Sequence, residues 1–259
     1  MSYAVSGTLM QNGGMMRAVI TAGGLVDGAF ADAIGTNVKA LAPYGSRALI
    51  DVAVDACTGA QIDGVVVIGG EEVRAHLAGR DGVRVVDADL DGRTNVLRAL
   101  DAWPGERFVY LTSDMPFATA SGLRDLIARS ERYALTMALA DADAYEARFP
   151  GAPGHSVALG GERVANGNAF VIAPSAVAPV RAMATKFFAA RKSLLKLALL
   201  LGPSMCLRFA TKRLTIAGVE AYGQRRLGVA VGALRGCDPG LCYDVDVRAD
   251  YEYACSLTG

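Results

Sequence analysis

The chain has few of the residues that would place it among metal-rich, disulfide-bonded or membrane-spanning proteins. It has only two histidines in 259 residues, which nearly excludes a histidine-rich metal site. Its five cysteines are odd in number and form no Cys-x-x-Cys pair, which indicates reduced, mostly buried thiols. Lys196, Gly202 and Pro203 interrupt the most apolar stretch. No run of about 18 apolar residues remains, and no membrane span is expected.

An excess of charge is also missing. The 26 basic residues are balanced by 26 acidic ones, whereas binding to a nucleic-acid backbone normally needs a basic surplus. No nucleic-acid partner is therefore expected. Residues 1–14 are polar and Gly-rich and lack the apolar core of a signal peptide. We expect residues 1–15 to be a disordered lead-in, residues 16–259 to form a single domain, and the protein to be cytoplasmic.

Short apolar runs alternate with helical patterns through the first half of the chain. The expected strands cover residues 17–22, 65–68, 82–86, 108–111 and 135–139. The expected helices cover residues 47–57, 71–78, 94–102 and 120–130, with Thr94 or Arg93 near the N-cap of the third. This alternation predicts an α/β fold with a mostly parallel, doubly wound sheet. Such sheets bind ligands outside the carboxyl ends of their strands.

The second half has a different pattern. We expect a loop over 141–153, a hairpin of 156–159 with 162–165, and further strands over 169–172 and 229–234. The expected helices cover residues 174–201, 207–227 and 248–255. An extended segment over 241–247 precedes the last of these helices. A helical subdomain over about residues 180–227, within or appended to the domain, is the simplest interpretation.

Small residues follow the first strand, where the backbone would come close to a ligand. Ala22, Gly23 and Gly24 end the strand, an irregular loop covers residues 25–38, and Lys39 comes next. A lysine there can reach phosphate as a mobile point charge. The sequence contains neither a G-x-x-x-x-G-K-[ST] loop nor a G-x-G-x-x-G turn after this strand. We therefore expect a nucleotide-phosphate site that is neither a P-loop nor a dinucleotide fingerprint.

Aspartates occur at two further positions that suit a metal. Asp114 leaves a buried strand in Thr112-Ser-Asp-Met-Pro116, where a carboxylate needs a cationic partner such as Mg²⁺ unless it serves as an N-cap. Asp244 and Asp246 share one face of an extended segment and repel unless a cation lies near. The alternative is a solvated edge, with Asp250 as a first-turn helix acid. Asp114 and Asp246 together would complete a metal clamp.

Four motifs in this order resemble those of the MobA-like nucleotidyltransferases, the molybdenum-cofactor guanylyltransferase type. The motifs are Ala22-Gly23-Gly24, then Gly35 with Lys39, then Thr112–Pro116, and finally Asp244–Asp250. The resemblance implies a GT-A-like, Rossmann-like three-layer α/β/α fold. It has a mostly parallel twisted sheet and a helical insertion in the C-terminal half.

The resemblance also implies substrates and a reaction. A nucleoside triphosphate (NTP) would bind over Ala22, Gly23 and Gly24, with Lys39 on its phosphates and Mg²⁺ held by Asp114 and Asp246. A phosphorylated small-molecule acceptor would attack the α-phosphorus and release pyrophosphate, with Lys39, Asp114 and Asp246 as the catalytic residues. The base pocket would include Thr94 and Asn95, and Asn168 would touch the acceptor. The sequence indicates neither the base, the acceptor nor an oligomeric state.

One departure from the family pattern leaves other activities open. The loop Arg-Met of the family corresponds to Ala33 and Ile34, and the loop before Lys39 contains no arginine. Arg17 or Arg47 would have to substitute, or the activity is altered or lost. Two alternatives are a GT-A-type glycosyltransferase that uses a nucleoside-diphosphate sugar and a non-catalytic nucleotide-binding protein.

The segment 186–213 is both basic and apolar. It contains Phe187, Phe188 and a leucine-rich run over residues 194–201, with seven basic residues among them. One interpretation is a helical cover over the sheet. The other is a lid that contacts a lipid-like or anionic acceptor, or a peripheral membrane contact.

Overall fold

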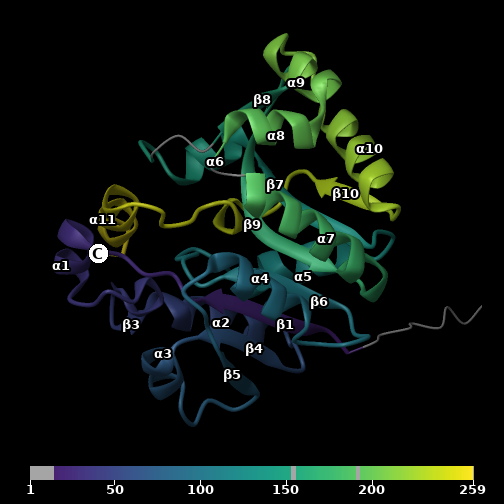
Figure 1. Ribbon diagram of the computed structural model, residues 1–259. Helices are drawn as coiled ribbons and strands as arrows, with labels where there is room; N and C mark the ends of the chain where they lie inside the picture. The colour runs from purple at the N-terminus through teal and green to yellow at the C-terminus, as the bar shows by residue number, and fades with distance from the viewer. Residues whose placement is uncertain (1–14, 153–155, 191–192, 259) are drawn as a thin grey trace, which may run out of the picture.

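A computed structural model describes residues 15–152, 156–190 and 193–258, so nearly all of the expected lead-in lies outside the described residues. An eight-stranded sheet forms the centre of the molecule (Figure 1), in the order β10-β7-β9-β6-β1-β4-β5, with β8 paired to β9. The strands are β1 (Arg17–Ala22), β4 (Val65–Gly69), β5 (Val83–Asp87), β6 (Phe108–Thr112), β7 (Leu135–Asp141), β8 (Ser156–Leu159), β9 (Glu162–Ile172) and β10 (Val231–Leu234). A separate small hairpin joins β2 (Pro43–Tyr44) to β3 (Arg47–Ala48).

The sheet is mostly parallel, as the sequence predicts. Strands β6, β1, β4 and β5 run parallel, and β10 is parallel to β7. Their register aligns Ala22 with Gly69 and Thr21 with Thr112, so the carboxyl ends of β1, β4 and β6 meet at one edge. Strand β9 runs antiparallel between β6 and β7.

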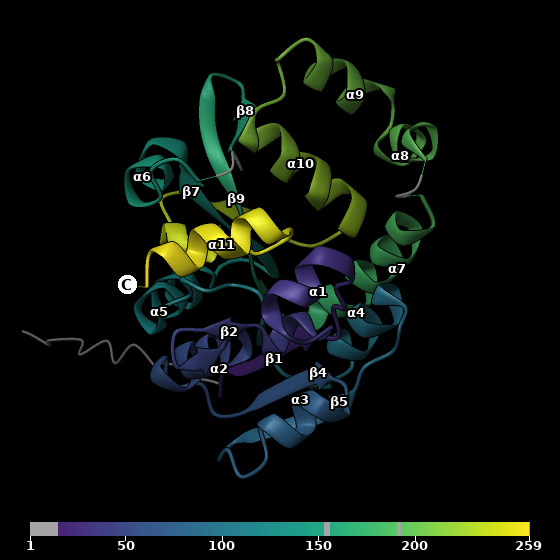
Figure 2. The ribbon, with the colours of Figure 1, turned by 90° about the vertical axis from the view of Figure 1, so that its left-hand side faces the viewer.

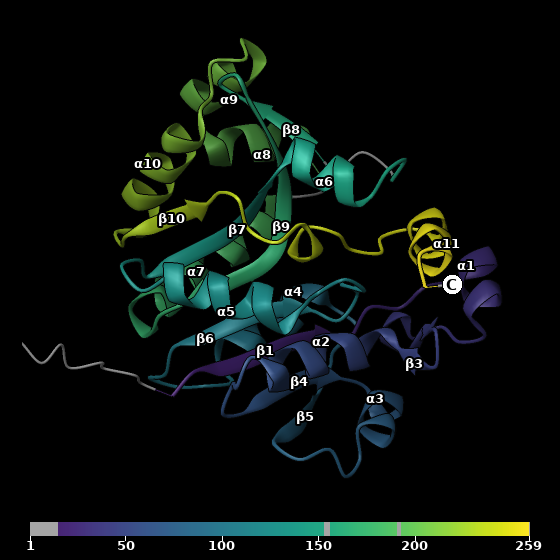
Figure 3. The same cartoon turned by 180° about the vertical axis from the view of Figure 1, so that it is seen from behind.

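Helices cover both faces of the sheet, and Figures 1 and 3 show these layers from opposite sides. Side chains alternate along β1, so Ala18 and Ile20 join one core while Val19 joins another. The first core packs against α2 (Leu49–Gly59), α3 (Glu71–His76) and α5 (Ala120–Arg129). The second packs against α4 (Gly92–Leu100) and α7 (Pro174–Ala190). The three-layer α/β/α prediction is therefore confirmed.

A third core lies beyond the carboxyl edge of the sheet. It joins α1 (Gly28–Ile34), α6 (Ala142–Arg148) and α11 (Arg248–Ser256), and Figure 2 shows α1 close to α11. Tyr243 is fully buried at its centre and contacts the rings of Phe117, Phe149, Tyr145 and Tyr253. This aromatic cluster anchors the segment that carries Asp244 and Asp246.

Two segments expected as loops contain helices. The loop over 25–38 includes α1, and the loop over 141–153 includes α6. Helix α1 ends at Gly35, whose φ of 71° is left-handed, and its Phe30 packs on Tyr251 of α11 with ring centroids 5.8 Å apart. Partners this distant in the sequence stabilise a short helix that local pattern alone does not reveal.

Strand β9 is one continuous strand where the sequence predicts two. A Cβ on Gly167 would lie 2.5 Å from the Ala138 carbonyl, and the pairing of β7 with β9 shifts register between Met137 and Leu139. Glycine therefore lets β9 pass an irregularity in the sheet without ending.

Several helix boundaries also differ from the sequence prediction. The first two residues of the helix expected over 47–57 form β3 instead. The helix expected over 94–102 is α4, which begins at Gly92 and has Asp91 as its N-cap. The two helices expected over 174–201 and 207–227 are four: α7, α8 (Leu194–Leu201), α9 (Pro203–Ala210) and α10 (Ile216–Leu227). Gly202 separates α8 from α9, and Pro203 is the first residue of α9. In the part of the chain that the structure describes, no helix has the length and apolar character needed to cross a bilayer.

Candidate functional site

Two segments far apart in the sequence meet at the carboxyl edge of the sheet. The Ser113 backbone N–H donates to the Thr21 carbonyl (3.0 Å), which ties the end of β6 to β1. The Val245 N–H donates to the Asp114 carbonyl (2.9 Å) and ties the C-terminal segment to the same place. These backbone bonds set the positions of Asp114, Asp244 and Asp246.

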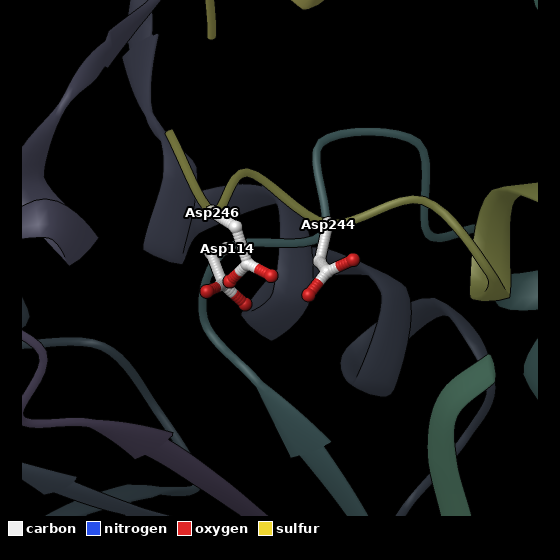
Figure 4. Close-up of side chains that lie close together, drawn as sticks. All are labelled: Asp114, Asp244 and Asp246. Atoms are coloured by element: carbon white, nitrogen blue, oxygen red, sulfur yellow. The ribbon is translucent and has the colours of Figure 1, made fainter. Parts of the chain in front are cut away.

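The three aspartates form one cluster, in which one carboxylate oxygen from each lies within 4.8 Å of the others. Figure 4 shows the carboxylates directed into a common space. Asp114 is buried, and its Oδ1 has no hydrogen-bond partner among the described residues. Asp246 lies at the solvent side, with 69% of its side chain exposed. The predicted pair of Asp114 and Asp246 is thus joined by Asp244.

Lys39 places a positive charge next to this cluster. Its backbone N–H donates to the Gly24 carbonyl (3.1 Å), and its Nζ donates to the Val245 carbonyl (2.9 Å). Nζ forms an ion pair with Asp114 Oδ2 and lies 3.9 Å from Asp246 Oδ1. Burial alone would lower the pKa of Lys39, but the Asp114 charge and hydrogen bond raise it above its usual range. Lys39 is therefore a charged group among the carboxylates.

The electrostatics of the cluster favour a cation. Burial and then the charges of Asp246 and Asp114 raise the pKa of Asp244 to about 7. One lysine offsets only one of three carboxylate charges. Hard carboxylate oxygens are the ligands that divalent cations such as Mg²⁺ prefer, and the unpartnered Asp114 Oδ1 is available as one. The donor set therefore fits a divalent metal.

The glycine pair lies beside this cluster. Ala22 ends β1 and is buried, and a Cβ on Gly23 would lie 2.6 Å from Asn95 Nδ2 and 2.9 Å from Ala88 Cβ. A Cβ on Gly24 would lie 3.4 Å from Lys39 Cε, which is ordinary contact. Only glycine fits at position 23, whereas position 24 has more room.

Thr94 and Asn95 hold the loop that follows β5. The Asn95 amide bonds both backbone groups of Asp89: Nδ2 donates to its carbonyl (2.8 Å), and Oδ1 accepts from its N–H (2.6 Å). The Thr94 hydroxyl donates to Asp91 Oδ2 (3.2 Å). The structure therefore shows these side chains supporting the 88–91 loop against Gly23. Their place in a base pocket stays a prediction.

Asn168 lies in β9 rather than in a loop. The register pairs Tyr110 of β6 with Phe170, and Asn168 comes two residues nearer the carboxyl edge of β6. Because β9 is antiparallel, its first half extends toward the edge where β6 ends. Asn168 is half-buried there. Contact with an acceptor stays a prediction.

Arg17 and Arg47, the two residues that could replace the missing loop arginine, form ion pairs with other acidic residues. Arg17 is at the opposite end of β1, where Nε bonds Glu106 (2.7 Å) and the guanidinium lies over Trp103. Arg47 pairs with Asp55 on α2 (2.9 Å). Positions 33 and 34 belong to α1, where Ile34 is buried in the third core. The suggestion that Arg17 substitutes is therefore wrong, and Arg47 is tied to α2.

Asp250 has a structural role in this arrangement. It is buried, and its Oδ2 accepts from the backbone N–H groups of Asp246 and Val247 (3.0 and 2.9 Å). It thus orients the segment before α11, as the first-turn interpretation suggests. Asp244 is the site residue that the implied clamp omits. The sequence feature that indicates Asp244 is its two-residue spacing from Asp246, which places both carboxylates on one face of the extended segment.

Comparisons with known proteins agree with this fold. A sequence model of the MobA-like NTP transferase domain matches residues 18–198. A hypothetical transferase from Thermus thermophilus is 29% identical, with a TM-score of 0.78 over 90% of this chain and 98% of its own. A 4-diphosphocytidyl-2C-methyl-D-erythritol synthase from Anaerococcus prevotii is 13% identical, with a TM-score of 0.56 over 95% and 99%. Rv0371c from Mycobacterium tuberculosis, solved with manganese, is 17% identical, with a TM-score of 0.51 over 93% and 98%. No curated protein matches the chain.

Proposed function

Because this chain belongs to the MobA-like NTP transferase family and is a nucleotidyltransferase, we propose that it transfers a nucleoside monophosphate from an NTP to a phosphorylated small-molecule acceptor. The reaction depends on Mg²⁺ and releases pyrophosphate. The observation that carries this proposal is the cluster of three carboxylates with Lys39 at the carboxyl edge of the sheet. Family membership disfavours the glycosyltransferase and non-catalytic alternatives.

The triphosphate binds over Ala22, Gly23 and Gly24. Three features support this placement: small residues end β1, Lys39 lies against Gly24, and the edge is formed by the carboxyl ends of parallel strands. Lys39 exchanges its ion pair with Asp114 for the phosphates. The acceptor approaches from the side of Asn168.

Asp114, Asp244 and Asp246 hold the metal. When bound, Mg²⁺ neutralises charge on the phosphates and on the leaving pyrophosphate. An oxygen of the acceptor phosphate forms the new bond to the α-phosphorus, and the bond from the α-phosphorus to its bridging oxygen breaks. The chain supplies position and charge, and needs no side-chain nucleophile.

The reaction takes place in a reducing compartment, which for NTP chemistry is the cytoplasm. All five cysteines are free thiols, and Cys57, Cys237 and Cys242 are buried. Burial raises the pKa of Cys57, which keeps this thiol unreactive.

Pyrophosphate release tests the proposal. Each of the four NTPs is incubated with Mg²⁺ and a set of phosphate monoesters, including sugar phosphates, and the nucleotidyl product is identified by mass spectrometry. Release that requires an acceptor and disappears in Asp114→Asn is the expected result. The matched control is Asp63→Asn, an exposed acid before β4. Nucleotide binding without turnover, or consumption of a nucleoside-diphosphate sugar without pyrophosphate, would contradict the proposal.

A further inference from the structure

The charge of this neutral chain is segregated. Residues 163–219 contain no Asp or Glu, although the whole chain has 26. The same stretch contains nine basic residues: Arg163, Arg181, Lys186, Arg191, Lys192, Lys196, Arg208, Lys212 and Arg213. Arg225 and Arg226 follow on α10. The segment from residue 163 to the end of α10 therefore has a large excess of basic residues, with Glu220 of α10 as its one acid.

The same helices expose large apolar side chains. Leu195 and Leu199, one turn apart on α8, are 72% and 70% exposed, and Leu207 and Phe209 of α9 are 65% and 59% exposed. Leu201 is also exposed, and α9 has no buried residue. Most large apolar residues on a monomer surface are scattered singly, whereas a contiguous group marks a contact site.

A hollow of about 380 Å³ lies between these two helices and α10. Its wall includes Leu201, Met205, Arg208, Tyr222 and Arg225. Tyr222 and Arg226 donate to the Leu200 carbonyl, which fixes that wall. Neither Arg208 nor Arg225 forms an ion pair with any of the described residues. Free guanidinium groups beside leucines suit a ligand that is both anionic and apolar.

We propose that this face docks on a bilayer that contains anionic phospholipids. The face, named here the α8–α9 cap, consists of Leu195, Leu199, Leu201, Leu207 and Phe209 with Arg208, Lys212, Arg213, Arg225 and Arg226. Its apolar side chains enter the headgroup–acyl boundary, and its cations contact lipid phosphates. Figures 1, 2 and 3 place α8 and α9 at one end of the molecule, with α3 and β5 at the other.

Charge decides between the occupants of this surface. In a two-fold contact between two copies, each cap would meet the same cations on its partner, which costs electrostatic energy. A nucleic acid would satisfy the arginines but would leave the leucines in water. An anionic bilayer satisfies both groups. This inference does not rest on the proposed reaction.

Vesicle co-sedimentation of the full chain tests the proposal. We expect binding to vesicles of equimolar phosphatidylcholine and phosphatidylglycerol, much weaker binding to phosphatidylcholine alone, and loss of binding at high salt. A charge variant combines Arg208→Gln, Lys212→Gln and Arg213→Gln. Each cation removed should weaken partitioning about fivefold, so this variant loses roughly a hundredfold. An apolar variant combines Leu199→Gln, Leu207→Gln and Phe209→Gln, and should lose about tenfold or more.

Matched controls keep the outcome interpretable. The charge control combines Arg84→Gln, Arg93→Gln and Arg132→Gln, all exposed positions outside the cap. The apolar control combines Met15→Gln, Leu90→Gln and Leu257→Gln, all exposed positions outside the cap. Both controls should bind vesicles as the unchanged chain does, and thermal unfolding confirms that every variant folds.

Four results would overturn the proposal. They are no binding to anionic vesicles at low salt, equal losses in the controls, binding of inorganic phosphate or DNA without vesicle binding, and a dimer that the apolar variant abolishes while vesicles are not bound. Pyrophosphate release is measured separately, so failure of the docking proposal is distinguishable from failure of the proposed reaction.

Discussion

The Lys39 ammonium lies against the Asp114 carboxylate while it donates a 2.9 Å hydrogen bond to the Val245 carbonyl. It therefore occupies the space where a cation between Asp114 and Asp246 is expected. In this arrangement the lysine acts as an internal counter-ion for the carboxylates of the cluster. In the proposed mode of binding, a nucleotide with its metal moves this ammonium from carboxylate to phosphate.

Replacement of this lysine should separate metal binding from turnover. In Lys39→Met, loss of the competing cation is expected to tighten Mn²⁺ binding without nucleotide by about tenfold. The rate of pyrophosphate release should fall by about 10²–10³, because the phosphates lose a positioned charge. Calorimetric titration and steady-state kinetics measure the two effects. The exposed Lys186→Met is the matched control, and weaker Mn²⁺ binding in Lys39→Met would contradict the counter-ion role.

The raised pKa of Asp244 predicts a pH-dependent stability in the metal-free protein. The pKa is about 7 in the folded chain, against an ordinary value of about 4 for an unfolded aspartate. Between these values the folded state retains a proton that the unfolded state has lost. The free energy of unfolding therefore falls as pH rises from about 4 to about 7 and then levels.

Asp244→Asn should remove much of the fall in the free energy of unfolding between about pH 4 and about pH 7. With chelator present, its Tm is expected to match the unchanged chain near pH 4 and to exceed it at pH 8, by about 2–4 °C per kcal/mol regained. Added Mg²⁺ should stabilise the unchanged chain more than the variant. An equal Tm difference at both pH values would show that Asp244 is not the titrating group. Asp63→Asn should leave the pH profile unchanged.

The two glycines after β1 should respond differently to alanine. Asn95 is held by two hydrogen bonds to Asp89, so it cannot easily move away from a Cβ on Gly23. Gly23→Ala is expected to cost about 1–3 kcal/mol in the free energy of unfolding and to raise KM for the NTP. Gly24→Ala meets only a lysine methylene, and should change stability by less than about 0.5 kcal/mol. Denaturant unfolding checks both, and equal costs would contradict the close approach at Gly23.

Asp250 offers a test of structural support without metal ligation. One oxygen accepts both backbone N–H groups, and an asparagine carbonyl can accept them equally well. Asp250→Asn should therefore retain most activity. Asp250→Ala should lose about 1–3 kcal/mol of stability and part of the activity. A loss of Mn²⁺ affinity in Asp250→Asn would instead show that Asp250 binds the metal.

Features that depend on local pattern could be predicted from the sequence. Apolar runs that end in small or acidic residues identified β1, β4 and β6, and their shared carboxyl edge brought Gly23 and Asp114 together. The two-residue spacing of Asp244 and Asp246 indicated a common face. The predicted metal clamp nevertheless included only Asp114 and Asp246, although Asp244 is the first residue of the Asp244–Asp250 motif.

Features that depend on distant partners could not be predicted. Helix α1 depends on Phe30 packing against Tyr251, and the continuity of β9 depends on how Gly167 passes Ala138. The Lys39–Asp114 pair joins the first residue of a short 3-10 helix (Lys39–Leu41) to the loop after β6, and the two residues are far apart in the sequence. None of these contacts leaves a periodic signal in the neighbouring residues.

The order of the proposed metal ligands along the chain has a consequence for biosynthesis. Asp114 follows a strand in the first half, whereas Asp244 and Asp246 come just before α11 and depend on Tyr243 in the third core. A growing polypeptide folds from its amino-terminal part first. The nascent chain therefore assembles its glycine loop and Lys39 before a complete set of carboxylates exists. In a chain that folds as it is synthesised, the proposed metal site therefore forms later than the glycine loop beside it.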